Sequence, residues 1–290
     1  MTVREAIQLG SAELSPCGLR VPGVDALSIL RLVLGQTSMW IATSSDSELT
    51  SLQERRYGQL IRLRQNHFPI QYMSGAQEFY GRSFRVKPGV LIPRPETELV
   101  VGEALRLANH LEHHVISVLD IGTGSGCIAV SLACEEPRIL VTALEPSPVA
   151  LRVAAENCRR HGCTHRVELV CTEYLAYARA RKFHLITSNP PYLSRTSIEE
   201  TDRAVLDYEP HEALFGETEG LAVYREILES SQEQLIDGGC LILELAHDNL
   251  GKVEKLARDR GWKTLGVRND YSGWPRVMIL GRTPGEYSVQ

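Results

Sequence analysis

From residue 115 onward, short apolar segments alternate with amphipathic segments of helical period. This alternation predicts an α/β fold, in which a mostly parallel sheet carries helices on both faces. We expect strands at residues 115–121, 139–144, 167–171, 184–188, 240–245, 263–268 and 277–280, and helices at 126–134, 148–161, 221–236 and 248–261. Residues 269–276 alone separate the last two strands, and this segment is too short for a crossover helix. The final strand should therefore be antiparallel.

The first part of the chain has a different pattern. Apolar residues recur at helical spacing in segments 2–15, 25–35 and 47–66, and Asp25 is a good N-cap for the second helix. We expect residues 1–70 to form a small all-helical domain that recognises the substrate. Residues 71–95 form a linker in which Gly81, between aromatic-rich runs, predicts a β-hairpin. Residues 96–290 form the α/β domain.

Composition narrows the class of protein. The 290 residues carry a formal net charge of −5, which argues against a surface that wraps DNA. The N-terminus lacks an apolar signal core, and no apolar run is long enough to span a bilayer. Seven cysteines with no Cys-x-x-Cys are typical of reduced thiols, so we expect a cytoplasmic location. Cys158, His161, Cys163 and His165 match no common zinc spacing, and we expect no metal.

A glycine-rich turn follows the first predicted strand. It has the pattern Gly-x-Gly-x-Gly and comprises Gly122, Thr123, Gly124, Ser125 and Gly126. Glycines permit positive φ angles and a close approach of the backbone to a ligand. A dinucleotide-binding turn would have another glycine at Cys127. The turn therefore fits a nucleoside with a short zwitterionic tail better than a nucleotide, although a mere tight turn is the alternative.

Acidic residues follow the next two predicted strands. Glu145 lies about 20 residues after the last glycine, at the usual spacing for an acid that binds ribose hydroxyls. Glu173 follows the third strand, where its carboxylate could accept a hydrogen bond from an adenine amino group. Tyr174 could stack on the adenine ring. Each of these residues could also be an ordinary surface side chain.

The segment Asn189-Pro190-Pro191-Tyr192 follows the fourth predicted strand. Neither proline has an N–H group for the sheet, so the chain must leave its carboxyl edge, where α/β sheets bind ligands. A planar –NH2 group could donate hydrogen bonds to the Asn189 side-chain oxygen and the Pro190 carbonyl, with Tyr192 over its flat face. This would be catalysis by orientation. The alternative is a structural turn with Tyr192 in the core.

Together these residues resemble the class I S-adenosylmethionine-dependent methyltransferases, and among them the HemK/PrmC family of release factor glutamine methyltransferases. The similarity also includes residues 69–75, the run from Gly89 to Glu98, and Tyr208-Glu209-Pro210. It implies a seven-stranded Rossmann-like sheet, a helical N-terminal domain and a hairpin linker. It also implies methylation of the glutamine in the Gly-Gly-Gln motif of class I peptide chain release factors, which modulates translation termination.

The resemblance also implies roles for individual residues. Asn189, Pro190 and Tyr192 would be catalytic, and these three with Pro191 would bind substrate. S-Adenosylmethionine would contact Gly122, Thr123, Gly124, Ser125, Gly126, Glu145, Glu173, Tyr174 and Asn189, and S-adenosylhomocysteine would be the product. The family usually has aspartate where Glu145 and Glu173 stand, and an acid at Pro275. We expect a monomer with release factors as partners and no direct nucleic-acid or membrane partner.

Two other functions fit parts of the sequence. A methyltransferase for the exocyclic amino group of a base could use the same motif, with Tyr192 stacked on the flipped base. The acidic net charge argues against it. A catalytically silent cofactor-binding protein is the other alternative, and the intact Asn189 and Tyr192 argue against that. Direct methyl transfer to an amide nitrogen needs no general base, and His184, inside a predicted strand, should be a core residue.

Overall fold

The structure is a computed structural model that describes residues 1–173, 181–192, 202–215 and 221–282. The chain divides into two compact units, which we treat separately. The helical unit comprises residues 1–76 together with residues 202–208, and the α/β unit comprises residues 77–201 and 209–290. Tyr174, which the sequence suggested for adenine stacking, lies outside the described residues.

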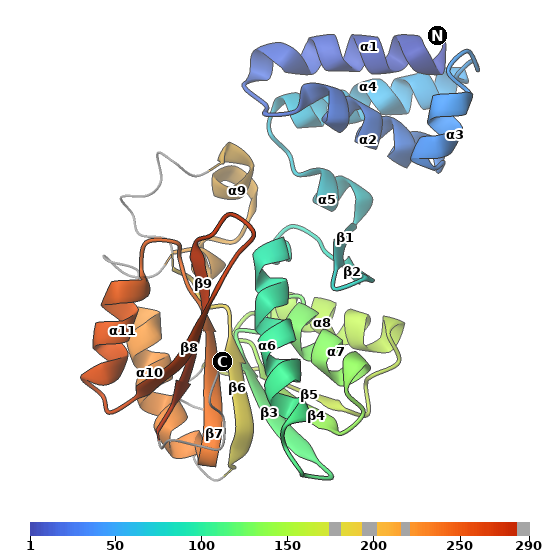
Figure 1. Cartoon of the computed structure of the whole chain (residues 1–290). Helices are drawn as coiled ribbons and strands as arrows, with labels where there is room; N and C mark the ends of the chain where they lie inside the picture. The colour runs from blue at the N-terminus through green and yellow to red at the C-terminus, as the bar shows by residue number, and fades with distance from the viewer. Residues whose placement is uncertain (174–180, 193–201, 216–220, 283–290) are drawn as a thin grey trace. The chain divides into compact units, whose positions relative to one another are not determined.

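The helical unit is built from short helices around one apolar core (Figure 1). The elements are α1 (Val3–Leu14), η1 (Ser15–Cys17), α2 (Pro22–Leu34), α3 (Ser38–Thr43), α4 (Ser51–Gln65), α5 (Ile70–Ser74) and α9 (Arg203–Tyr208). Thr2 and Thr50 begin α1 and α4 with capping boxes, each satisfying backbone N–H groups that a helix start leaves free. Ile29, Leu30 and Ile61 are among the fully buried side chains of the core.

The predicted role of Asp25 as an N-cap is wrong. Helix α2 begins at Pro22, because proline suits the first helical position, where its missing N–H is no loss. Asp25 lies one turn further on and is buried, where its Oδ2 pairs with Arg64 Nε at 2.7 Å. The acid therefore joins α2 to α4 and does not cap a helix.

Helix α9 brings a distant stretch of sequence into the helical unit. The Tyr208 hydroxyl donates to the backbone oxygen of Asn66 at 2.7 Å, and its ring meets Phe68 edge-on with centroids 5.0 Å apart. The sequence pattern did not predict this helix. It also did not predict α3, which at six residues is too short to show a helical period.

The α/β unit contains a hairpin and a seven-stranded sheet. The hairpin consists of β1 (Ala76–Phe79) and β2 (Arg82–Arg85), joined by Tyr80 and Gly81, which both have positive φ as in a tight hairpin turn. The sheet strands are β3 (Ile116–Ile121), β4 (Ile139–Leu144), β5 (Val167–Val170), β6 (Phe183–Ser188), β7 (Leu235–Glu244), β8 (Lys263–Asn269) and β9 (Pro275–Gly281). Their order is β5-β4-β3-β6-β7-β9-β8, and β9 is antiparallel to both neighbours, as predicted.

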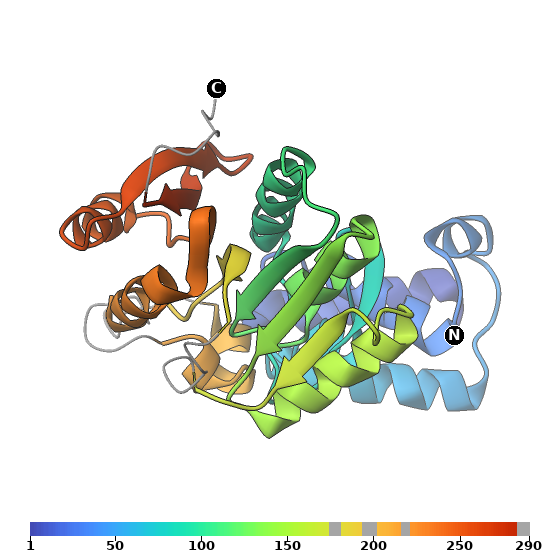
Figure 2. The ribbon, with the colours of Figure 1, turned by 90° about the horizontal axis from the view of Figure 1, so that it is seen from below.

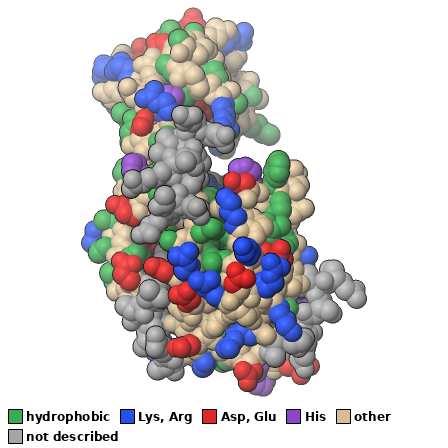
Figure 3. All heavy atoms as spheres, turned by 90° about the vertical axis from the view of Figure 1, so that its left-hand side faces the viewer, with side chains coloured by type: hydrophobic (Ala, Val, Ile, Leu, Met, Phe, Trp, Pro, Cys, Tyr) green, Lys and Arg blue, Asp and Glu red, His purple; other side chains and the backbone are tan. Residues whose placement is uncertain are grey.

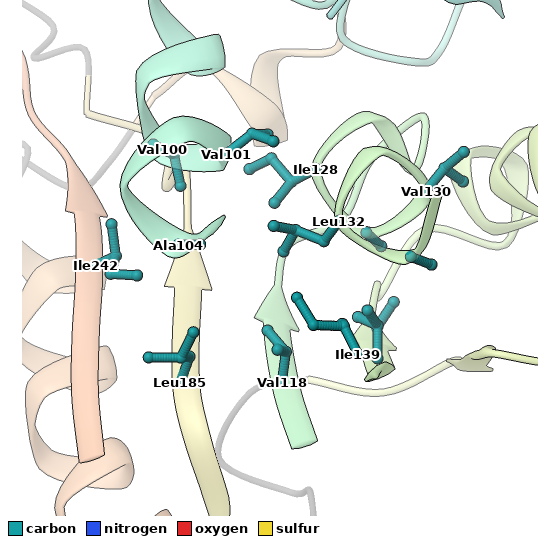
Figure 4. Close-up of a cluster of buried hydrophobic side chains, with 14 of the residues drawn as sticks. Val100, Val101, Ala104, Val118, Ile128, Val130, Leu132, Ile139, Leu185 and Ile242 are labelled. Carbon is teal, nitrogen blue, oxygen red and sulfur yellow. The ribbon is translucent and has the colours of Figure 1, made fainter. Parts of the chain in front are cut away.

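Helices cover both faces of this sheet (Figures 1 and 2). One face carries α6 (Glu98–Asn109), α7 (Cys127–Glu135) and α8 (Pro148–Arg160), and the other carries α10 (Ala222–Gln234) and α11 (Leu250–Arg258). Figure 4 shows the first core, where Val100 and Ala104 of α6 and Ile128 of α7 lie over Val118 and Leu185 of the sheet. The α/β prediction is confirmed.

The sheet register places the candidate site. Strand β3 lies between β4 and β6, so the chain changes direction across the sheet at β3, which is where open α/β sheets bind ligands. Ile121 pairs with Leu144 and with Ser188, and Ser188 pairs with Leu243. Neighbouring strands therefore end at the same edge of the sheet. The glycine turn, Glu145 and Asn189 follow three of these strands, and Glu244 is the last residue of β7.

Two further findings concern the surface. No described helix has a stretch both apolar and long enough to cross a membrane. Figure 3 shows acidic and basic side chains interspersed on one face of the α/β unit, without a continuous stripe of one charge.

Candidate active site

The glycine turn is held in a left-handed conformation that glycine adopts without strain. Gly122, Gly124 and Gly126 have φ angles of 72°, 57° and 82°. The N–H groups of Gly122 and Thr123 both donate to the Leu144 carbonyl, at 3.0 and 2.9 Å, and Gly126 N–H donates to the Thr123 oxygen at 2.8 Å. These bonds fix the turn against the end of β4.

Gly124 and Gly126 are needed for different reasons. A Cβ atom on Gly126 would lie 3.2 Å from Ala154 Cβ and 3.3 Å from its Cα, so this glycine allows α8 to pack closely. Among the described residues beyond its two chain neighbours, the atom nearest to a Cβ atom on Gly124 would be the Gly122 carbonyl oxygen, at 4.0 Å. Gly124 therefore leaves open space beside the turn, which a ligand can use.

Glu145 is directed at this turn. Its Oε2 accepts from Gly124 N–H at 2.8 Å, its Oε1 accepts from Ser147 N–H at 2.9 Å, and the residue is only 8% exposed. Burial raises the pKa of Glu145, although these two N–H groups lower it. Each carboxylate oxygen has a further lone pair, so the group can still accept from ribose hydroxyls. Glu173 is exposed, and its charge also raises the pKa of Glu145.

Asp120 supports the turn from the end of β3. Its side chain is fully buried, and its Oδ1 accepts from the Thr187 hydroxyl at 2.8 Å. Burial raises the pKa of Asp120 to about 6. Ser188 donates from its hydroxyl to the Ile121 carbonyl at 2.8 Å. Side-chain bonds therefore join β3 and β6 immediately before the turn and before Asn189.

Asn189 is held by a residue that lies far from it in sequence. Its Nδ2 donates to Thr97 Oγ1 at 3.0 Å. Thr97 ends the 3-10 helix η2 (Pro95–Thr97) and is only 2% exposed. Because an amide carries its –NH2 and its carbonyl oxygen on opposite sides of the Cγ atom, this bond sets the direction of Oδ1, which is the acceptor of the group.

Tyr192 is held from the neighbouring strand. Its hydroxyl donates to Glu244 Oε1 at 3.3 Å, and its ring packs against the core on the α10 face. Glu244 is fully buried at the end of β7, and burial raises its pKa to about 7, while the Thr97 hydroxyl and Arg276 oppose the rise. The ring therefore has a structural contact, as the alternative interpretation of the motif supposed.

Comparisons with known proteins agree with this geometry. Residues 5–75 match the family described as PrmC N-terminal domain, and residues 96–207 match the family described as Methyltransferase small domain. A release factor glutamine methyltransferase of Koribacter versatilis is 38% identical, over 98% of this chain and 99% of that protein. The chain belongs to the release factor glutamine methyltransferase family. The resemblance found in the sequence is confirmed, and the chain is a protein methyltransferase of this family.

Two further relatives and one solved structure are also similar to this chain. A release factor glutamine methyltransferase of Moorella thermoacetica is 36% identical over 97% of this chain and 99% of that protein. The bifunctional methyltransferase of Rickettsia typhi is 30% identical, and the alignment spans 57% of its length. A methyltransferase structure from Pyrococcus furiosus, 17% identical, matches 78% of this chain and 98% of that chain with a TM-score of 0.52, which shows the fold.

Two of the motifs that resemble the family are bonded to each other in the α/β unit. Glu209, 4% exposed, accepts from Ile92 N–H at 3.0 Å and pairs with the Arg94 guanidinium. Glu98 Oε1 accepts from Tyr80 N–H at 2.7 Å and so holds the hairpin turn. The charged residues of these motifs therefore position the backbone around the site.

Three residues of this site had no predicted role in it: Thr97, Glu209 and Glu244. Glu244 had a recognisable signal, since a carboxylate follows the apolar residues 240–243 at the end of β7. Thr97 and Glu209 lie in motifs that resemble the family, where Thr97 or Glu96 is expected only to open the helix toward His110. His184 is half-buried at the opposite end of β6, where its Nδ1 accepts from Ser117 N–H at 3.0 Å.

The cysteine and histidine cluster is engaged in local contacts. Cys163 Sγ donates to the Cys158 carbonyl at 3.6 Å, and His161 Nε2 lies 3.1 Å from the Ser83 carbonyl oxygen. Within the described part of the chain, no three His, Cys, Asp or Glu side chains are arranged to hold a metal ion.

Proposed function

We propose that this protein transfers a methyl group from S-adenosylmethionine to the side-chain amide nitrogen of the glutamine in the Gly-Gly-Gln motif of class I peptide chain release factors. The observation that carries the proposal is the anchored amide of Asn189. Its –NH2 group donates a hydrogen bond to Thr97, so its oxygen is left to accept an N–H from a second amide. Asn189 follows β6, which pairs with β3, the strand before the glycine turn. The names of the Koribacter and Moorella relatives support this substrate.

The cofactor would lie along the glycine turn. The open space beside Gly124 and the carboxylate of Glu145 fit a nucleoside, with the ribose hydroxyls donating to Glu145. Glu173 would accept from the adenine amino group, Tyr174 would stack on the ring, and the turn from Gly122 to Gly126, with Thr123 and Ser125, would contact the remainder together with Asn189. Bound S-adenosylmethionine would supply an electrophilic methyl group.

The chain's own residues would orient the substrate nitrogen. One N–H of the glutamine amide would donate to Asn189 Oδ1 and the other to the Pro190 carbonyl, with Tyr192 and Pro191 beside the planar group. Resonance makes an amide nitrogen a weak nucleophile, so alignment must supply much of the rate. Orientation of this kind can contribute roughly 7–11 kcal/mol in favourable cases. The methylated amide is acidic enough to lose its extra proton to water.

Mass spectrometry would test the proposed function directly. A release factor incubated with this protein and S-adenosylmethionine should gain one methyl group on the glutamine of its Gly-Gly-Gln motif. A release factor whose glutamine is replaced by alanine is the control and should gain none. Methylation of an adenine- or guanine-containing oligonucleotide in place of the release factor would favour the nucleic-acid alternative.

Glu145→Ala should weaken cofactor binding. The substitution removes a buried carboxylate that holds Gly124 N–H and would accept from ribose, so the loss should be about 1–3 kcal/mol of binding free energy. Isothermal calorimetry with S-adenosylmethionine would measure it. Glu173→Ala, at an exposed position, should have a smaller effect. An unchanged dissociation constant for Glu145→Ala would remove Glu145 from the proposed site.

The helical unit should serve the protein substrate and not the cofactor. A shortened chain that begins at residue 77 lacks most of this unit but keeps the glycine turn and Asn189. We expect it to bind S-adenosylmethionine with unchanged affinity and to lose turnover on an intact release factor, because the larger binding surface is gone. Steady-state kinetics would show this, with calorimetry as the control for folding. Full turnover by the shortened chain would contradict the assigned role.

A further inference from the structure

Thr97 carries a buried hydroxyl group directly before helix α6. It is 2% exposed and lies directly before α6, whose Val100, Val101 and Ala104 are fully buried in the core. A buried hydroxyl is unfavourable unless it is hydrogen-bonded. Thr97 Oγ1 accepts a hydrogen bond from Asn189 Nδ2 at 3.0 Å.

The backbone that carries Thr97 is fixed from several directions. Thr97 N–H donates to the Arg94 carbonyl at 3.2 Å, and Arg94 is paired with the buried Glu209. On its other side, Thr97 continues into α6 and the core of the sheet. The hydroxyl is therefore held in a fixed position, whereas Asn189 comes directly before two prolines, which have no N–H group to donate to the sheet.

Glu244 explains why the Thr97 oxygen acts as an acceptor. The Thr97 hydroxyl lies beside the buried Glu244 carboxyl and lowers its pKa. A carboxyl oxygen is a hydrogen-bond acceptor, so it attracts the hydroxyl proton and leaves the lone pairs of Thr97 Oγ1 to accept from Asn189. Glu244 Oε2 has no partner within hydrogen-bond distance among the described residues, so this oxygen is free to attract the hydroxyl proton. Tyr192, Arg276 and Glu96 also act on this carboxyl.

We propose that Thr97 is a positioning residue for methyl transfer, which selects the orientation of the Asn189 amide in which the carbonyl oxygen faces the substrate. The inference rests on the proposed function for its catalytic consequence. A half turn about the Cβ–Cγ bond of asparagine interchanges the carbonyl oxygen and the –NH2 group. The two groups are nearly the same size, so packing alone does not select one orientation. In the rotated orientation Asn189 would present N–H groups to the N–H groups of the substrate amide, and the substrate would not be held.

The kinetic test compares two substitutions of Thr97 that differ in whether they keep the hydroxyl. Thr97→Val removes the hydroxyl and keeps the shape, and Thr97→Ser keeps the hydroxyl. We expect Thr97→Val to lower kcat on a release factor about tenfold, which is the upper range for one net hydrogen bond, with unchanged calorimetric affinity for S-adenosylmethionine. Thr97→Ser should restore most of the rate. A wild-type kcat for Thr97→Val, or equal losses for both variants, would overturn the proposal.

A double-mutant cycle separates positioning from a general structural role. If Thr97 acts through Asn189, then Thr97→Val should cause no further loss of kcat in an Asn189→Ala protein. A structural role would produce the same tenfold loss in both backgrounds, and that result would overturn the proposal. The melting temperature of each variant gives the matched control for folding.

A measurement that does not depend on turnover distinguishes this inference from the proposed function. The Asn189 side-chain –NH2 signals in a ¹H–¹⁵N spectrum can be assigned by their loss in Asn189→Ala. We expect their hydrogen exchange to be at least about tenfold faster in Thr97→Val than in the wild type or Thr97→Ser. Equal exchange in all three proteins would overturn the positioning role. An absence of methylation by the wild type would instead contradict the proposed function alone.

Discussion

Asn189→Ala should lower kcat on a release factor by about 10²-fold or more, measured with S-adenosylmethionine at saturation. The side chain is the acceptor that would align the substrate amide, and small errors of alignment are costly in a reaction that depends on orientation. The structure strengthens the expectation, because Asn189 is bonded to a buried threonine and is not a freely rotating surface amide.

Asn189→Asp is the informative companion of this variant. It keeps an oxygen that can accept the substrate N–H, but it adds a charge and loses the –NH2 group that binds Thr97. We therefore expect a rate between those of the wild type and Asn189→Ala. Single-turnover kinetics with both variants would separate the chemical step from product release. A wild-type kcat in Asn189→Ala would show that the proline turn is merely structural.

Gly124→Val should abolish measurable cofactor binding at ordinary concentrations. The backbone at Gly124 has a φ of 57°, which a β-branched residue adopts only with strain of order 1–3 kcal/mol. The added side chain would also project into the space beside the turn, where the nearest described atom beyond the adjacent residues, the Gly122 carbonyl oxygen, lies 4.0 Å from a Cβ atom. Strain and lost space act together on the affinity, which calorimetry would measure.

Gly81→Val is the matched control for this effect. Gly81 also has a positive φ, of 69°, and open space around a Cβ atom, but it lies in the hairpin turn between β1 and β2. It should lower the melting temperature through the same backbone strain and leave the affinity for S-adenosylmethionine unchanged. If Gly124→Val also binds the cofactor normally, the glycine turn is a structural feature and the cofactor lies elsewhere.

The sheet and its helices were predictable because their signals are local. Burial makes parallel strands mostly apolar, as in β4, where Thr142 is the one polar residue, and the helix between two strands carries a period that the sequence displays directly. The antiparallel β9 followed from the length of the connection alone. The predictions failed where local rules compete, as when Pro22 begins α2 ahead of Asp25.

The class of fold, the family and the types of side chain at the carboxyl edge could be predicted from the residues alone, because each motif is contiguous. How those motifs support one another depends on the folded chain. Thr97 meets Asn189 across 92 positions of sequence, and Glu209 meets Arg94 across 115. Contacts of this kind depend on the strand order and on the orientation of single side chains. Neither leaves a periodic signal along the chain, so the role of Thr97 could be read only once the fold had brought it to Asn189.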